Sequence, residues 1–91
     1  MMVAVTVFSR ADCHLCEEAV AVLERVRATH PFELTLVDLD QEAPAEKREA
    51  YDLEVPVVEL NGRKIMKYRV EEARLVRLLE LALESDRGPM A

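Results

Sequence analysis

Apolar residues follow two different periods along the 91-residue chain, and each change of period marks a change of element. Met2–Phe8 is rich in β-branched residues and almost wholly apolar, which predicts a strand buried on both faces. Ser9–Asp12 follows as a short polar loop. From Cys13 onward the apolar residues recur at helical spacing with charged residues between them, which predicts an amphipathic helix. The apolar stripe of this helix comprises Cys16, Ala19, Val20, Leu23 and Val26.

The middle of the chain predicts a second strand and a short helix. A residue that precedes a proline is pushed out of the α region, so the first helix is expected to end at His30-Pro31. The alternation of Phe32–Leu39 predicts a strand. Pro44 suits the first turn of a helix, which we expect to run to about Tyr51.

The clearest local signal is a hairpin in the second half of the chain. Strand-like runs at Val57–Leu60 and Lys64–Tyr68 flank Asn61-Gly62, a dipeptide that type I′ turns favour. A last helix is predicted over Glu71–Glu84, with Ser85–Pro89 ending it. Its apolar stripe comprises Leu75, Leu78, Leu79 and Ala82.

The predicted order of elements is therefore β-α-β-α-β-β-α, which indicates an α/β fold. Two parallel strands joined through the first helix require a right-handed crossover, and the later hairpin extends the sheet at its side. We expect a four-stranded mixed sheet. No internal repeat or linker interrupts residues 1–91, so the chain is expected to form a single domain.

Composition and charge argue against several classes of protein. The chain is 51% apolar and 33% charged, which are the proportions of a globular protein. Its net charge of −6 argues against non-specific binding to nucleic acid or to an anionic membrane. The longest apolar stretch, Met1–Phe8, is too short to span a bilayer and lacks the features of a signal peptide. We therefore expect a cytoplasmic monomer with no nucleic-acid or membrane partner.

The two cysteines of the chain form a single C-x-x-C motif, Cys13 to Cys16. Disulfide scaffolds use four or more cysteines with long loops between them, and so short a loop would add little stability. In a cytoplasmic chain, reversible redox chemistry or metal binding is the better interpretation.

The segment Phe8–Cys16 resembles the aromatic-Ser-Lys-x-x-Cys-Pro-Tyr-Cys segment of glutaredoxins, a branch of the thioredoxin-fold superfamily. With Val55-Pro56-Val57 before the hairpin, the resemblance covers the whole chain, and it is closest to the divergent small bacterial glutaredoxin-like proteins. It implies a thioredoxin fold, with the sheet flanked by three helices. It also implies a thiol–disulfide oxidoreductase that reduces disulfides in proteins or small molecules.

The resemblance also assigns roles to individual residues. Cys13 takes the nucleophilic position and Cys16 the resolving one. Arg10 stands where the family has a lysine. Pro56 takes the position of a cis-proline that faces the active site, and Val55 that of a residue whose backbone pairs with the substrate.

Two departures from the family pattern modify these expectations. The dipeptide between the cysteines is His14-Leu15 instead of Pro-Tyr, and Leu15 is expected to join Val55 and Pro56 in binding substrate. The glycines and the aspartate that bind glutathione in the family are replaced by Arg69–Glu72. We therefore expect glutathione to be a poor ligand, and the electron donor to be a flavoprotein reductase or another dithiol protein. We expect no metal and no cofactor besides the redox-active disulfide.

Charges around Cys13 are expected to set its reactivity. A helix N-terminus favours the thiolate, and Arg10 can add a permanent positive charge three residues earlier. His14 can stabilise the thiolate when protonated; the alternative is an exposed residue with little effect. Three nearby carboxylates disfavour the thiolate: Asp12, Glu17 and Glu18. Asp12 could instead serve as the helix N-cap. We expect a moderately lowered pKa for the Cys13 thiol.

Two other functions could use the same cysteines. A metal or iron–sulfur carrier would need a dimer or external thiols, because one chain offers only Cys13, Cys16 and two poorly placed histidines. A redox-regulated interaction module would change its affinity for a partner without turnover. The basic residues of positions 63–77 are typical of a solvated hairpin and helix face, the alternative being a docking patch for an acidic partner. They are Arg63, Lys64, Lys67, Arg69, Arg74 and Arg77.

Overall fold

The computed structural model describes residues 3–86, and its elements follow the predicted order. The first half of the chain forms strand β1 (Ala4–Ser9), helix α1 (His14–Arg27), strand β2 (Glu33–Asp38) and helix α2 (Ala45–Tyr51). The second half forms the hairpin strands β3 (Val57–Leu60) and β4 (Arg63–Lys67), and helix α3 (Glu72–Asp86). Met2, at the expected start of the first strand, and Gly88 and Pro89, expected to end the last helix, lie outside the described residues.

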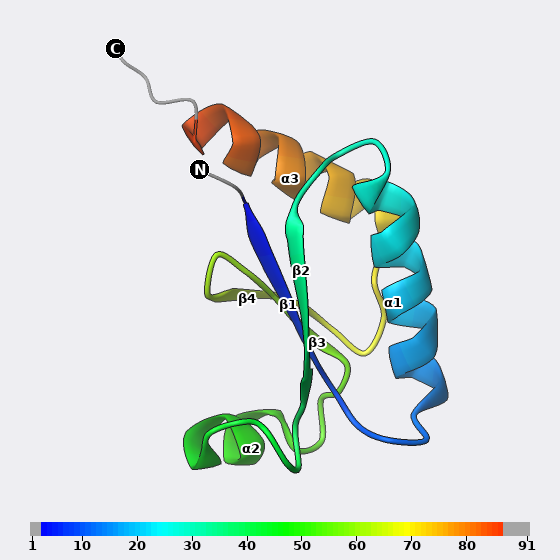
Figure 1. Ribbon diagram of the computed structural model, residues 1–91, viewed down its shortest axis with the longest axis vertical. Helices are drawn as coiled ribbons and strands as arrows, with labels where there is room; N and C mark the ends of the chain where they lie inside the picture. The colour runs from blue at the N-terminus through cyan, green and yellow to red at the C-terminus, as the bar shows by residue number, and fades with distance from the viewer. Residues whose placement is uncertain (1–2, 87–91) are drawn as a thin grey trace.

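The strands form one four-stranded mixed sheet in the order β2-β1-β3-β4, which confirms the prediction (Figure 1). β1 pairs in parallel with β2 and antiparallel with β3, and β3 pairs antiparallel with β4. Helices α1 and α3 pack on one face of the sheet and α2 on the other. No helix within residues 3–86 combines the length and the apolar character needed to cross a membrane.

Alternation along β1 supplies a core on each face of the sheet. Val5 and Val7 are fully buried beneath α1 and α3, whereas Phe8 packs on the opposite face against Tyr51 of α2. The predicted helical stripes supply the covering layer: Leu23 of α1 and the two fully buried leucines of α3 belong to the first core. Those leucines are Leu75 and Leu79.

The hairpin turn has the predicted geometry. Asn61 (φ 51°) and Gly62 (φ 84°) both adopt the left-handed conformation that a type I′ turn requires. Asn61 also accepts a hydrogen bond at Oδ1 from the Ala4 N–H (2.9 Å) and donates its own N–H to the Ala4 carbonyl (2.7 Å). The turn residue thereby ties the hairpin to the start of β1.

The ends of β4 and the last residue of α3 differ from the prediction. β4 begins at Arg63, which pairs with Leu60 directly after the turn, and it ends before Tyr68, whose positive φ of 68° does not fit a strand. α3 continues through Asp86, past Ser85 where it was expected to end. Neither Ser85 nor Asp86 interrupts a helix as strongly as glycine or proline does, so the helix extends over both.

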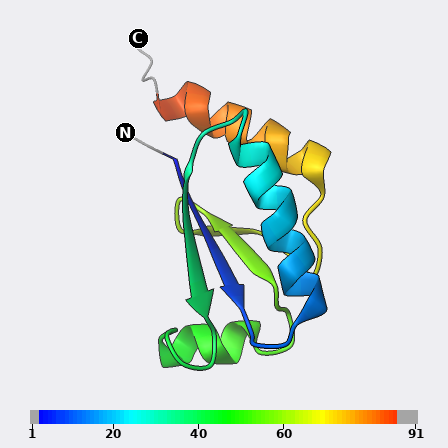
Figure 2. The same ribbon diagram turned by 45° about the vertical axis from the view of Figure 1, so that its right-hand side comes forward.

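Parallel pairing brings the functional loops to one edge of the sheet. The chain leaves β1 and β2 at the same edge (Figure 2), where Ser9 pairs with Asp38. β3 enters at this edge because it is antiparallel to β1, with Val57 opposite Phe8. The loop that leads to Cys13, the loop after β2 and the Val55–Pro56 segment therefore lie around one end of β1.

A buried ionic network attaches α2 to the sheet. Glu59, in β3, has only 6% of its surface exposed, and its carboxylate accepts hydrogen bonds from Lys47 Nζ (2.5 Å) and the Tyr51 hydroxyl (2.7 Å). The hydrogen bond with Glu59 raises the pKa of Lys47, while burial is the first cause that raises the pKa of Tyr51. Tyr51 also meets the Phe8 ring edge to face, with centroids 5.3 Å apart.

We predict that Lys47→Met lowers the free energy of unfolding by about 2–3 kcal/mol, because it leaves the Glu59 carboxylate buried without its cationic partner. A raised lysine pKa stabilises the fold below the ordinary value of 10.5, so the difference from wild type should persist to that pH and shrink above it. Urea unfolding at several pH values measures this. Lys64→Met, which breaks a more exposed pair with Glu54, is the control and should cost less. Equal losses would contradict the prediction.

Candidate functional site

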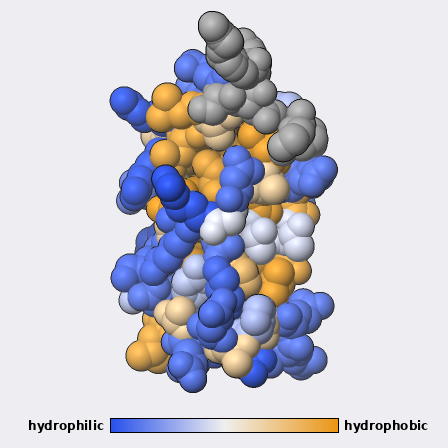
Figure 3. Space-filling model, turned by 90° about the vertical axis from the view of Figure 1, so that its left-hand side faces the viewer, coloured by the Kyte–Doolittle hydropathy of each residue, from blue (hydrophilic) through white to orange (hydrophobic). Residues whose placement is uncertain are grey.

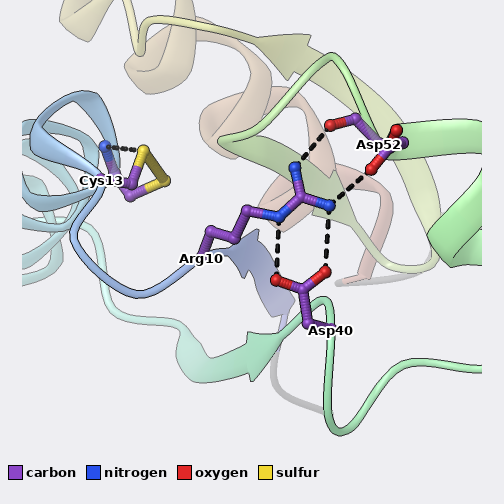
Figure 4. Close-up of a disulfide and its surroundings, with 5 residues drawn as sticks. Arg10, Cys13, Asp40 and Asp52 are labelled. Atoms are coloured by element: carbon purple, nitrogen blue, oxygen red, sulfur yellow. Dashed lines mark hydrogen bonds and ion pairs between the residues drawn. A yellow bond between two sulfur atoms is a disulfide. The ribbon is translucent and has the colours of Figure 1, made fainter.

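A disulfide joins Cys13 and Cys16 at the amino-terminal end of α1, with Cα atoms 5.2 Å apart (Figure 4). The two sulfurs differ in access. Cys13 has intermediate exposure, whereas Cys16 is 4% exposed and is one of the buried residues of α1. The arrangement pairs an outer sulfur with a shielded one.

Local backbone geometry makes Cys13 the N-cap of α1. Asp12 has a left-handed conformation (φ 58°), which aspartate tolerates better than most residues, and Cys13 is extended (φ −103°, ψ 107°). The Cys13 sulfur accepts a hydrogen bond from the Cys16 N–H at 3.2 Å. The alternative that Asp12 caps the helix is therefore wrong, and the helix begins at His14, one residue later than expected.

Arg10 is directed away from the cysteines, contrary to the expectation that it tunes the thiolate (Figure 4). Its guanidinium forms a two-bond fork with the Asp40 carboxylate, at 2.9 and 3.0 Å. It also donates to the carboxylate of Asp52 at 2.6 Å and to the Asp52 carbonyl at 2.7 Å. These bonds raise the pKa of Arg10 and lower that of Asp40. A planar guanidinium matches two carboxylates better than one sulfur, which explains why Arg10 bonds Asp40 and Asp52.

The position of His14 does not favour a role in stabilising the Cys13 thiolate. Its side chain is 82% exposed, and Nε2 lies 2.9 Å from a carboxylate oxygen of Glu18, one turn along α1. This geometry favours the alternative of an exposed residue with little effect on the sulfur.

A hollow of about 420 Å³ lies beside the disulfide. The loop after β1 and one face of α1 line it, with both cysteines on its wall. The lining residues are Ser9, Arg10, Ala11, Asp12, Cys13, Cys16, Glu17 and Val20. The half-buried Val20, predicted as part of the apolar stripe of the helix, contributes an apolar side to this hollow.

The expected substrate-binding residues lie in two other places. The Val55–Pro56 peptide bond is cis, as predicted, and Pro56 is buried. Within residues 3–86, Val55 forms no backbone hydrogen bond, so its peptide groups stay available. Leu15 lines a smaller hollow, of about 110 Å³, together with Arg69 and Val70. The segment that replaces the family's glycines therefore lies next to the C-x-x-C helix.

The basic stretch forms a separate hollow of about 420 Å³ between β4 and the start of α3. Figure 3 looks onto the side of the molecule on which β4 lies, and hydrophilic side chains cross it between smaller apolar patches. Both lysines that line this hollow, Lys64 and Lys67, form ion pairs with Glu54. Paired lysines on an edge strand fit the expected solvated face.

Metal ligands are not gathered elsewhere in the part of the chain that the structure describes. Within residues 3–86, no group of three or more His, Cys, Asp and Glu side chains is placed to hold an ion. The metal-carrier hypothesis would still need ligands from outside the chain.

Comparison with known proteins settles the family. The model of a family described as "Glutaredoxin-like domain (DUF836)" matches residues 4–80, which include the disulfide, the cis-proline and most of α3. The chain belongs to this family. The predicted resemblance to glutaredoxin-like, thioredoxin-fold proteins is thereby confirmed.

Solved structures place the glutaredoxin-like chain in the thioredoxin fold. A structural-genomics target protein from X. campestris is 33% identical, with 85% of this chain and 96% of that one covered and a TM-score of 0.66. Protein Ne2328 from Nitrosomonas europaea is 24% identical, with 86% and 92% covered and a TM-score of 0.75. A thioredoxin variant from Halobacterium salinarum is 21% identical, with 87% and 73% covered and a TM-score of 0.64. The last two show likeness of fold alone.

The sequence interpretation missed the carboxylates that hold Arg10. Asp40 and Asp52 lie 30 and 42 positions from Arg10, so no local spacing marks them as its partners. The only available signal was the parallel pairing of the first two strands. It sets the loop with Asp40 beside the loop with Arg10.

We predict that Arg10→Met raises the pKa of Asp40 toward its ordinary value of 3.8, because the hydrogen bond from Arg10 is the first cause of its depression. In the wild type, a depressed pKa means that this contact stabilises the fold fully above pH 3.8. The stabilisation is lost as the pH falls through the lowered value. Carboxyl-carbon NMR titration measures the shift. Asp52→Asn, which keeps the fork to Asp40, should leave the Asp40 pKa low, and an unchanged pKa in Arg10→Met would contradict the assignment.

Proposed function

We propose that the protein is a thiol–disulfide oxidoreductase in which Cys13 attacks and Cys16 resolves. One observation carries the proposal: an accessible sulfur caps a helix, and a shielded sulfur lies one turn along, at bonding distance from it. Membership of the glutaredoxin-like family supports the same chemistry.

The proposed reaction begins with the reduced protein. The Cys13 thiolate attacks one sulfur of a disulfide substrate, whose S–S bond breaks, and the first substrate thiolate leaves and takes a proton from water. A mixed disulfide now joins Cys13 to the other half. Cys16 then loses its proton and attacks the Cys13 sulfur, which forms the internal disulfide and releases the second substrate thiol. The substrate gains two electrons and the protein loses two.

The helix end supplies the stabilisation of the Cys13 thiolate in this proposal. The Cys16 N–H already points at the Cys13 sulfur, and a sulfur anion accepts such a bond more strongly than a neutral sulfur does. The positive end of the α1 dipole adds to it. Arg10 has no part in stabilising the thiolate in this proposal, because its guanidinium is bonded to Asp40 and Asp52.

Substrate contacts are proposed for three residues around the disulfide. Val55 keeps its backbone groups available before β3, so an extended substrate segment could pair with it as an added strand. Pro56 carries no N–H that could compete for a sulfur. Leu15, which is half-buried next to Val70, would offer an apolar contact beside Cys13.

We predict opposite outcomes for the two cysteine variants. Cys13→Ser should abolish reduction of insulin and of small disulfides, because the attacking sulfur is lost. Cys16→Ser should accumulate a mixed disulfide on Cys13, because nothing resolves it. Intact-mass spectrometry under non-reducing conditions identifies the adduct.

Three results would contradict this division of labour. Faster alkylation of Cys16 than of Cys13 in the reduced native protein would reverse the roles. A stoichiometric zinc ion or iron–sulfur cluster in anaerobically purified protein would favour the carrier hypothesis. Redox-dependent partner binding without any turnover would favour the interaction module.

We predict slow reduction of the internal disulfide by glutathione, and faster reduction by a flavoprotein reductase or another dithiol protein. Val70 is half-buried against the core and carries a β-branched side chain where the family has glycines, so the backbone cannot close on the tripeptide. An assay that couples glutathione to its reductase measures this rate. Turnover with micromolar affinity for glutathione would overturn the prediction.

A further inference from the structure

The charges around the disulfide hollow are unbalanced. Two carboxylates line the hollow, and two more bond its one guanidinium, that of Arg10. Asp12 and Glu17 line the hollow itself, Asp12 directly before Cys13 and Glu17 one turn into α1. Both side chains are exposed to solvent, so a charged molecule that approaches the disulfide passes them.

The arginine does not offset these carboxylates. Arg10 is the only cationic residue among those that line the hollow, and two carboxylates of its own lie within 3.0 Å of its guanidinium nitrogens. Figure 4 shows this guanidinium facing Asp40 and Asp52 rather than the sulfurs. By contrast, Asp12 and Glu17 have no cationic partner within 4.0 Å among residues 3–86. The ionised side chains around the sulfurs therefore carry a net negative charge.

Such negative side chains change the rate at which a charged substrate reaches the disulfide. A cleft lined by charges of one sign attracts ions of the opposite sign and can change their rate of association by a factor of about 10 or more. The same field repels an anion, and in 0.15 M salt its screening length is about 8 Å.

We propose that Asp12 and Glu17 make the site selective for disulfides that carry positive charge next to the sulfurs, and that they disfavour anionic disulfides. The inference rests on the proposed oxidoreductase function and names the class of substrate for the same cysteines. Cys13 forms the mixed disulfide and Cys16 resolves it, as in the reaction above, so the selection acts on the approach of the substrate. Oxidised glutathione, which has a net negative charge, falls in the disfavoured class.

Three small disulfides of similar length test the proposal with the reduced full-length protein. Cystamine is cationic, bis(hydroxyethyl) disulfide is neutral and dithiodipropionate is anionic. Stopped-flow oxidation rates are divided by those of dithiothreitol with the same compound, which removes the intrinsic reactivity of each. At low salt the normalised rate with cystamine should exceed that with dithiodipropionate by about 10-fold. High salt should reduce this ratio, with little change in the neutral rate.

The carboxylates are tested by the double variant Asp12→Asn, Glu17→Gln. Asparagine tolerates the left-handed conformation of position 12, so the loop should keep its shape. The cation-to-anion ratio should fall at least about 3-fold. Glu84→Gln removes a negative charge at the far end of α3, away from the disulfide, and should leave the ratio unchanged (Figure 1).

The outcomes separate the two proposals. If the neutral disulfide oxidises the protein but the ratio is close to one, or does not change in the double variant, the charge selection is overturned while the oxidoreductase function stands. An equal fall in Glu84→Gln would assign the effect to net charge and also overturn the local inference. If even the neutral disulfide fails to oxidise Cys13 and Cys16, the oxidoreductase function itself is wrong.

Discussion

The parallel pairing of β1 with β2 is the constraint on which the redox site depends. Parallel neighbours cannot be joined by a tight turn, so the chain must leave β1, cross over through α1 and return. The beginning of that crossover is the loop that carries Arg10 and Cys13. Because both strands end at the same edge, the loop after β2 lies beside it, and Asp40 comes within reach of Arg10. The topology thus places the loop with Asp40 beside the loop with Arg10 and Cys13.

The carboxylate partners of Arg10 change the electrostatic character expected from family resemblance. A basic residue before the C-x-x-C motif suggests a positive environment for the sulfur. In the structure, the guanidinium of Arg10 instead bonds Asp40, in the loop after β2, and Asp52, at the end of α2. The sulfur keeps the backbone N–H and the end of α1 as its stabilising partners. In the proposed reaction, the Cys13 anion would therefore be stabilised by peptide dipoles rather than by a side-chain cation.

Most of the fold could be predicted from the sequence because its signals are local. The hairpin followed from Asn61-Gly62, and the two buried stripes followed from helical spacing in α1 and α3. The cis-proline required the family resemblance. Three features could not be predicted: the Arg10 contacts, the Glu59 network and the cap at Cys13. The first two join side chains from different elements, and the third depends on the backbone angles of one loop residue.

The hydrogen bond from the Cys16 N–H to the Cys13 sulfur has a consequence for the energetics of the proposed redox cycle. In the proposed reaction, the sulfur that caps the amino-terminal end of α1 is the same atom that changes chemical state. A thiolate accepts this bond more strongly than a disulfide sulfur does, so the proposed reduction does not require the helix to lose its N-cap. The helix and its redox centre are then thermodynamically linked: whatever tightens the first turn of α1 also favours the anion.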